Sequence, residues 1–306
     1  MKALISTGLA ICVAIPIVVM GQWPDYPTRG VPRNDKGEPI MDGPTPRTAD
    51  GHPDFSGVWT LRAGGGGQLK GKDGKGPPPD GKGPPPDGKG PPPGQFAKGK
   101  GKGDGLPPPS EGPPVASFRS VGQNFKGGLP LKPAAKALVE ARDAEHSKDN
   151  PDAHCLPLGL MQLHEHPQPR KIIQTPGLIV MLYEAQAGIR QIFMDGRPLP
   201  KDVLPWWYGY SVGHWEGDTL VVETTGFRDD VWLDIIGNPL TETGKMTERF
   251  RRPNYGSLEI DVTFEDPSVY TEPFTVRVNQ RIMPDTDLIE FICTENDRSG
   301  PHLVGK

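Results

Sequence analysis

From residue 171 onward, apolar and polar residues alternate in short runs that are separated by turn-forming residues. A period of two places alternate side chains on opposite faces of an extended chain, so each run predicts a β-strand with one buried face. Nine such runs follow residue 170, and one more lies near the N-terminus. The predicted strands are Phe55–Leu61, Lys171–Thr175, Leu178–Glu184, Ile189–Met194, Tyr208–Trp215, Thr219–Thr225, Met246–Arg252, Ser257–Glu265, Phe274–Met283 and Leu288–Cys293.

Loops of hairpin length join most of these runs, which predicts an antiparallel meander. A sheet of so many strands usually curls and closes on itself. Only residues 131–147 show helical spacing, with Leu131, Ala135, Leu138 and Val139 on one side. The predicted fold class is therefore mainly β: an antiparallel meander that closes into a barrel or strongly curved sheet, with one helix and a disordered insertion.

The insertion is predicted from composition. Much of the excess of glycine and proline, 40 and 38 residues in the whole chain, falls in residues 63–115, where DGKGPPP occurs three times in succession. Such a tract has almost nothing to bury and favours solvated polyproline II segments. It is either a tolerated surface insertion or a lysine-rich tether for an anionic polymer of the cell envelope.

The N-terminus predicts export. Residues 1–21 contain one lysine, an apolar run and a small-residue end, as in a signal peptide, and cleavage would give a mature chain that begins at Gln22. The alternative is an uncleaved anchor, since the run is nearly long enough to span a bilayer. With cleavage we expect no transmembrane segment and a periplasmic or secreted protein. Residues 22–54 predict an irregular segment, 55–62 the first strand, and 116–306 the main β domain.

Two cysteines, Cys155 and Cys293, remain outside the signal peptide. In an oxidising compartment two cysteines most simply form one disulfide. The alternative is a thiolate nucleophile, which export disfavours. The net charge of -4 and the lack of an aromatic-flanked basic stripe argue against a nucleic-acid partner.

The segment WEGDTLVVET predicts a hairpin whose turn is Gly217–Asp218. In this register Trp215 lies opposite Leu220, and His214 and Glu223 share the other face. Inside a barrel, His214 and Glu223 could carry out general acid–base chemistry, because the pKa of histidine is easily set near neutrality. On the outer face they would form only a salt link.

His164 and His166 are candidate metal ligands. In an extended segment both imidazoles would point the same way, as two ligands of one ion must. Nearby prolines also allow an exposed irregular segment with solvated histidines. We predict no other cofactor: the chain has no nucleophile elbow, phosphate loop, dinucleotide fingerprint or cysteine-based zinc pattern.

Charged and aromatic residues provide candidate ligand contacts. Glu184, next to Tyr183, faces Arg190 across a predicted hairpin and could pair with it, and it is also a third candidate catalytic carboxylate. Asp195 and Arg197 predict a pair that fixes the next turn. If these charges face a barrel interior, they need partners and could orient a ligand. The later strand adds a further alternating set: Glu248, Arg249 and Arg251.

Aromatic residues are concentrated between residues 206 and 232. They would form either a platform for sugar rings or flat apolar ligands, or the plugs of the barrel ends. We single out as candidate ligand-binding residues Tyr183, Arg190, Trp206, Trp207, Tyr208, Trp215 and Arg249.

Several segments resemble an uncharacterised family of exported bacterial proteins, and together they cover the mature chain apart from the repeat tract. They are PDFSGVW (53–59), PGLIVMLYE (176–184), RQIFMDGRPLP (190–200), GYSVGHWEGDTLVVETTGF (209–227), TERFRR (247–252), DPSVYTEP (266–273) and ICTEN (292–296). The resemblance implies export and a shared β domain, and it brings no reaction with it. The triplet Gly57-Val58-Trp59 is more weakly similar to the first strand of lipocalin-like barrels.

These features rank three functions. The first is an exported barrel that binds a small or carbohydrate-like ligand. The second is an extracytoplasmic hydrolase or lyase that acts on glycan-derived substrates with His214, Glu223 and Glu184, or with a metal held by His164 and His166. The third is a structural protein tethered to the envelope.

Overall fold

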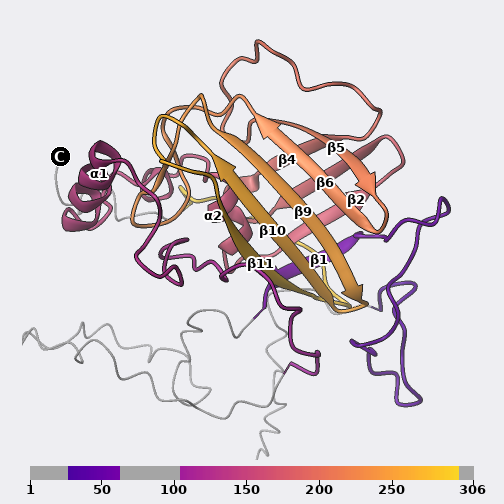
Figure 1. Ribbon diagram of the computed structural model, residues 1–306. Helices are drawn as coiled ribbons and strands as arrows, with labels where there is room; N and C mark the ends of the chain where they lie inside the picture. The colour runs from indigo at the N-terminus through magenta and orange to yellow at the C-terminus, as the bar shows by residue number, and fades with distance from the viewer. Residues whose placement is uncertain (1–26, 63–103, 296–306) are drawn as a thin grey trace, which may run out of the picture.

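The computed structural model describes residues 27–62 and 104–295 (Figure 1). The predicted signal peptide and most of the predicted insertion lie outside these residues. The helices are α1 (Pro133–Ala144) and α2 (Leu160–Glu165), with 3-10 turns η2 (Pro151–His154) and η3 (Ala185–Ala187). The strands are β1 (Gly57–Leu61), β2 (Arg170–Gln174), β3 (Leu178–Tyr183), β4 (Ile189–Phe193), β5 (Tyr210–Glu216), β6 (Thr219–Thr225), β7 (Val231–Trp232), β8 (Pro239–Leu240), β9 (Lys245–Asn254), β10 (Ser257–Glu265) and β11 (Phe274–Ile282).

Nine of these strands form a closed barrel, in the order β1-β11-β10-β9-β6-β5-β4-β3-β2. The predicted fold class is therefore confirmed. β1 closes the barrel by pairing with both β2 and β11, and Trp59 lies opposite Arg170 on one side and Ile282 on the other. The tenth predicted strand, 288–293, is not a strand. The short pair β7–β8 was not predicted.

The predicted antiparallel meander is wrong at one junction, because β4 and β5 are parallel. Up and down strands cannot alternate all the way around a closed ring with an odd number of strands, so one neighbouring pair must run in the same direction. Residues 194–209 make the crossover that a parallel pair requires. The pairing at this junction is short, with only Ile192 opposite Ser211 and Phe193 opposite Val212.

The predicted hairpin register is confirmed. Trp215 lies opposite Leu220, and His214 lies opposite Val221. The turn residue Gly217 has a φ of +59°, a conformation that favours glycine at the first central position of a hairpin turn. Because a shift of one residue would turn every side chain to the other face, this register decides which residues of β5 and β6 face the interior.

The helix α2 fills the barrel interior. All six of its residues are buried, and Figure 1 shows it behind β9 and β10. Apolar side chains from the surrounding strands pack around it, among them Trp59, Met181 and Phe250, which are at most 2 % exposed. The interior is therefore a packed core rather than an open cup, and α2 corrects the prediction of a single helix.

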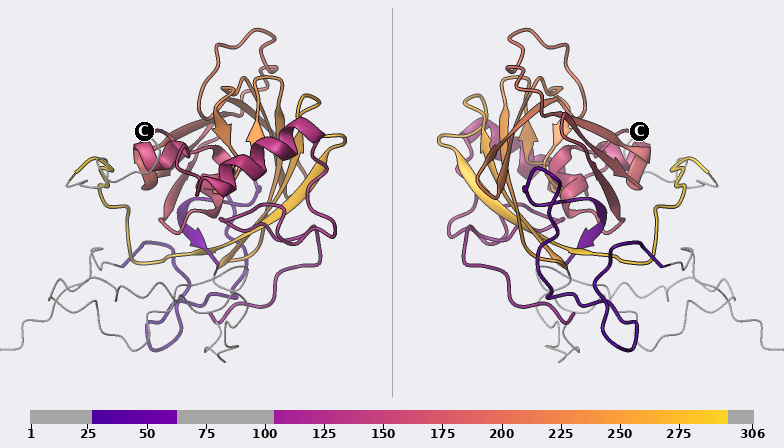
Figure 2. Two further views of the ribbon diagram at one scale, coloured as in Figure 1. Left: turned by 90° about the vertical axis from the view of Figure 1, so that its left-hand side faces the viewer. Right: turned by 90° about the vertical axis from the view of Figure 1, so that its right-hand side faces the viewer.

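The helix α1 corresponds to the predicted helix 131–147 and lies outside the barrel (Figures 1 and 2). Pro133 starts it, which suits a position where no helical hydrogen bond is lost. Ala135 and Val139 face inward, and Arg142 lies over the ring of Trp232 at 4.3 Å. The helix thus covers the connections at one end of the barrel.

Residues 104–115, the end of the predicted disordered tract, pack against the barrel. Asp104 forms an ion pair with Arg62 at 2.7 Å, so the two described ends that flank residues 63–103 lie together. The backbone N–H of Ser110 donates to Glu259 at 2.7 Å, and Arg277 donates to the Ser110 carbonyl at 2.7 Å. The predicted boundary at residue 115 is therefore too late.

Cys155 and Cys293 form the predicted disulfide, with their Cα atoms 5.5 Å apart. The bond ties the segment after β11 to the segment that leads into α2. A disulfide is typical of an oxidising, extracytoplasmic environment. Among the described residues, no helix has the length and apolar character needed to cross a bilayer.

Candidate functional site

A group of charged and hydroxyl side chains lies in the barrel interior next to the β4–β5 junction. Arg190 on β4 forms a bidentate ion pair with Glu248 on β9; one of its two hydrogen bonds measures 2.9 Å. Arg190 also donates to Ser211 at 3.1 Å and to Thr224 at 2.9 Å. The Nε2–H of His164 donates to Glu248 at 2.7 Å. We call these five residues the charge cluster.

The charge cluster carries no net charge. Burial alone would raise the pKa of Glu248, but the charge of Arg190 and the hydrogen bonds from His164 and Arg190 lower that pKa to about 2. Burial lowers the pKa of His164, which is therefore neutral at pH 7 and donates through Nε2. One guanidinium thus balances one carboxylate, and Arg190 has an acceptor at each of its three nitrogens.

A second polar group lies at the end of α2. Arg170 donates to the carbonyls of His164 at 2.6 Å and His166 at 2.9 Å, and so caps the last turn of the helix. Gln280 donates to the same His164 carbonyl at 3.3 Å. Burial raises the pKa of Glu165, whose Oε1 has no partner among the described residues, to about 7. This group titrates near neutrality.

The pocket that reaches the charge cluster opens at the β4–β5 junction. β5 begins at Tyr210, so residues 189–191 of β4 have the loop 206–209 beside them instead of a strand. A pocket of about 220 Å³ lies in this space. We call it the aromatic pocket; its lining is Pro157, Ile189, Arg190, Gln191, Phe193, Trp206, Trp207, Tyr208, Gly209, Tyr210 and Ser211.

Rings form most of the wall of the aromatic pocket. Phe193 stacks on Tyr210 with centroids 5.1 Å apart, and Tyr210 is 6.0 Å from Trp206. Trp206 is 49 % exposed, so much of its surface is available to a ligand. Burial raises the pKa of Tyr208 to about 12, so its hydroxyl stays protonated and can donate a hydrogen bond. Arg190 and Ser211 bring the edge of the charge cluster into the lining.

Trp207 also borders a neighbouring pocket. That pocket measures about 430 Å³, and its lining includes Arg142, Asp149, Asp230 and Trp232. Arg228 lies over the Trp207 ring at 4.6 Å. The two pockets therefore form consecutive ring-lined spaces on either side of Trp207.

The structure brings four of the seven predicted ligand-binding residues into one pocket: Arg190, Trp206, Trp207 and Tyr208. Tyr183 lies next to them inside the barrel, with its ring centroid 6.4 Å from that of Tyr208. The other two residues are elsewhere. Trp215 stacks on His52 at 4.4 Å, and Arg249 pairs with Glu216 on the outer face at 2.7 Å.

The candidate acid–base pair lies on the outer face of the barrel. His214 and Glu223 have side chains that are 54 % and 32 % exposed. His214 contacts Glu216 at 3.4 Å, and Glu223 forms an ion pair with Lys245. A salt link on the outer face was the alternative interpretation of this pair, although the partners differ from the expected ones. A reaction that uses His214 and Glu223 stays a prediction.

The expected geometry of the metal site is wrong. His164 belongs to α2 rather than to an extended segment, and its Nε2 is bonded to Glu248. His166 follows the helix and packs edge-on against Phe118, with ring centroids 5.1 Å apart. Burial lowers the pKa of His166 to about 4. Within residues 27–62 and 104–295, no group of three or more His, Cys, Asp or Glu residues is placed to hold a metal ion.

The predicted Glu184–Arg190 ion pair is also wrong, because Arg190 pairs with Glu248. Glu184 is buried at the end of β3, where it accepts a hydrogen bond from the backbone of Ile289 at 3.3 Å. The predicted pair of Asp195 and Arg197 is confirmed, with Nε of Arg197 2.8 Å from Asp195 Oδ1.

Sequence reasoning missed the partners that lie far along the chain. Glu248 was noted only as a member of an alternating charged set, and Ser211 and Thr224 were not singled out. The predicted register does contain a signal for these two residues, since it places both on the interior face directly opposite each other. Comparison of the chain with protein-family models, with curated proteins and with solved structures gives no match.

Proposed function

We propose that this protein is an exported binding protein that holds a neutral, ring-shaped ligand of the carbohydrate type in the aromatic pocket. The observation that carries the proposal is the gathering of Phe193, Trp206, Trp207, Tyr208 and Tyr210 around one opening in the barrel wall. Sugar rings bind to exposed aromatic faces through their apolar C–H surface, while hydroxyl and amide groups of the site fix their orientation.

The electrostatics favour a neutral ligand. Arg190 and Glu248 neutralise each other, so the base of the aromatic pocket offers no unbalanced charge to an ion. The groups that remain for hydrogen bonding are neutral, namely the Tyr208 hydroxyl and the Gln191 amide. Neutral donors and acceptors beside aromatic rings suit a sugar better than a purely apolar molecule.

The size of the pockets favours more than one sugar unit. A space of about 220 Å³ is smaller than the roughly 300–1,000 Å³ of drug-sized sites, so the aromatic pocket alone suits a single ring. The second space, of about 430 Å³, lies on the other side of Trp207. A disaccharide that straddles Trp207 would use both.

Export and family membership complete the proposal. The disulfide supports an extracytoplasmic location, and we place the protein in the periplasm or outside the cell. The resemblance to exported bacterial proteins with the GYSVGHWEGDTLVVET signature agrees with this location. A role of the lysine repeats in binding an anionic polymer falls on residues outside the described ones.

The test is calorimetric titration of the mature protein with three neutral disaccharides: cellobiose, maltose and N,N′-diacetylchitobiose. We expect at least one of them to bind, and the Trp206→Ala variant to weaken that binding at least tenfold. The control is Leu204→Ala, which removes a 79 % exposed side chain from the same loop but outside the pocket lining. If no sugar binds, or if both variants weaken binding equally, the proposal is wrong.

A further inference from the structure

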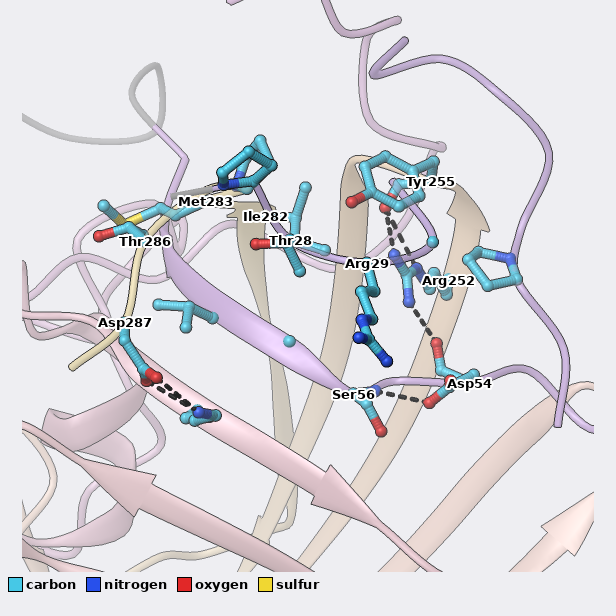
Figure 3. A pocket seen from close by; sticks show the side chains of 17 residues that line it. Thr28, Arg29, Asp54, Ser56, Arg252, Tyr255, Ile282, Met283, Thr286 and Asp287 are labelled. Atoms are coloured by element: carbon cyan, nitrogen blue, oxygen red, sulfur yellow. Dashed lines mark hydrogen bonds and ion pairs between the residues drawn. The ribbon is translucent and has the colours of Figure 1, made fainter. Parts of the chain in front are cut away.

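A second pocket lies between the N-terminal segment and the edge of the barrel where β1 begins. It measures about 660 Å³ and shares no lining residue with the aromatic pocket. We call it the N-terminal pocket; its lining is Pro27, Thr28, Arg29, Gly30, Pro46, Asp54, Ser56, Gly57, Val58, Lys171, Arg252, Tyr255, Ile282, Met283, Pro284, Thr286 and Asp287 (Figure 3). None of these residues was predicted from the sequence as a site residue.

Two guanidinium groups in this lining lack a carboxylate partner. In the described part of the chain, neither Arg29 nor Arg252 has a carboxylate oxygen within the 4.0 Å of an ion pair, although most other described arginines do. Figure 3 shows the Arg29 side chain extending from the N-terminal segment in the direction of Ser56. The Arg29 side chain makes no hydrogen bond to another described residue, so all its donors are available.

Arg252 is held in place by backbone carbonyls. It is 5 % exposed and donates to the Tyr255 carbonyl at 2.6 and 3.2 Å and to the Asp54 carbonyl. Trp59 lies beneath the guanidinium, with the ring centroid 4.9 Å from its carbon. These contacts use three of the five N–H donors of a guanidinium, so two remain for a ligand. Burial lowers the pKa of Arg252 to about 10, and the group is still a cation at pH 7.

The acidic side chains of the N-terminal pocket do not cancel these charges. Asp287 accepts two hydrogen bonds from Lys171, at 2.8 and 3.0 Å. Asp54 is the one carboxylate left in the lining, and it accepts from the backbone of Ser56 at 2.8 Å. Against Asp54 stand the two cations Arg29 and Arg252, so the lining has a net positive charge.

Hydroxyl groups add further donors. In the described residues, the Tyr255 hydroxyl has no hydrogen-bond partner, and burial raises its pKa, so it stays protonated. The Thr286 hydroxyl is buried without a partner in the same part of the chain. A pocket with two arginines and several hydroxyl donors is suited to a ligand rich in acceptors and negatively charged, because guanidinium groups pair with carboxylate and phosphate oxygens in a planar, bidentate manner.

We propose that the N-terminal pocket binds a small anion with carboxylate or phosphate groups, held between Arg29 and Arg252. The volume of about 660 Å³ allows a molecule larger than a simple inorganic ion. This inference does not depend on the proposed carbohydrate ligand, since the two pockets are separate in their lining and opposite in their electrostatics.

Calorimetric titration of the mature protein at pH 7 with citrate and with inorganic phosphate tests the proposal, and glucose serves as the neutral probe. We expect citrate, phosphate or both to bind and glucose not to bind at this pocket. Binding of citrate alone identifies a carboxylate site, and binding of phosphate alone a phosphate site. The measured affinity should fall as salt is added, because the attraction is between charges.

The decisive variant is Arg29→Ala, which should weaken anion binding about tenfold or more and leave the thermal midpoint unchanged, because Arg29 makes no contact that stabilises the fold. Lys36→Ala is the matched control: it removes one positive charge from the same N-terminal segment, outside the lining. The proposal is overturned if neither anion binds, if Arg29→Ala binds as tightly as the wild type, or if Lys36→Ala weakens binding equally.

Discussion

Arg190 and Glu248 form an ion pair across the barrel interior, although they belong to strands that are not neighbours. β5 and β6 lie between β4 and β9, and the Arg190 side chain contacts both on its way, through Ser211 and Thr224. It therefore joins β4 to the strands on the far side of the short parallel junction. We interpret this side chain as the main polar link that holds β4 and β5 together beneath the aromatic pocket.

Replacing one partner of this pair should be strongly destabilising. In Arg190→Met the Glu248 carboxylate stays buried and loses its counter-charge, and breaking a buried pair in this way typically costs about 3–5 kcal/mol. Chemical denaturation at pH 7 measures the change in the free energy of unfolding.

The double variant Arg190→Met/Glu248→Met separates the missing charge from the missing contacts. It should be more stable than Arg190→Met alone, because no charge is left buried without a partner. Arg249→Ala, which breaks an exposed ion pair, should cost less than about 1 kcal/mol. If Arg190→Met costs no more than Arg249→Ala, the link across the junction is not important for stability.

Glu165 should make stability depend on pH. Burial raises its pKa from 4.5 to about 7, so the folded state favours the protonated form. The stability that this proton provides is complete below pH 4.5 and is lost as the pH rises through 7, by up to about 3 kcal/mol. Glu165→Gln should remove this loss, so that the variant is more stable than the wild type at pH 8 and similar at pH 4.

Denaturation of the two proteins between pH 4 and pH 8 measures the effect. His166 acts in the opposite sense, because its pKa is lowered to about 4 and its contribution is lost as the pH falls from 6.5. The difference between variant and wild type therefore isolates Glu165. Glu140→Gln, an exposed change on α1, is the control and should show no such difference. Parallel pH curves for Glu165→Gln and the wild type would contradict the assignment.

The disulfide should contribute substantially to stability. Cys155 and Cys293 are 138 residues apart, and for a loop of this length the chain-entropy model gives up to about 5 kcal/mol. Cys293→Ser should lower the free energy of unfolding toward that amount, as measured by denaturation. A reducing agent should then destabilise the wild type but not the variant. An unchanged wild type under reducing conditions that break the bond would rule this contribution out.

The described ends of the insertion predict which deletion the fold tolerates. Removing residues 64–103 should change the free energy of unfolding by no more than about 1 kcal/mol, because Arg62 and Asp104 already lie together. Removing residues 64–114 should cost clearly more, since Arg277 then loses its acceptors on Ser110 and Pro114 loses its hydrogen bond from the Arg277 backbone. Equal losses in the two deletions would show that residues 104–114 do not stabilise the barrel.

Local patterns in the sequence predicted local structure well. The turn at Gly217 fixed the register of β5 and β6, and the pair of Asp195 and Arg197 followed from their closeness in the chain. Period-two runs located all nine barrel strands. The parallel junction was missed because the crossover 194–209 has no periodic pattern, and only the odd number of strands requires it.

Interactions between distant segments could not be predicted from these patterns. The helix α2 is six residues long and buried on all sides, so it has no polar face to reveal a helical period, and prolines on both sides suggested a loop. Arg190 was paired with the nearest carboxylate in the chain, Glu184, whereas its partner Glu248 is 58 residues away. The N-terminal pocket was missed for the same reason, because it joins Arg29 to Arg252.

The most direct test of the aromatic pocket is a ¹⁵N NMR titration of the indole N–H signals with N,N′-diacetylchitobiose, cellobiose and maltose. Trp206 and Trp207 lie in the pocket, whereas the Trp59 indole is buried and donates to the Phe55 carbonyl at 2.8 Å. The account predicts that at least one sugar shifts the Trp206 and Trp207 signals in a saturable manner while that of Trp59 stays in place. Indole signals of Trp206 and Trp207 that do not move with any of the three sugars would contradict it.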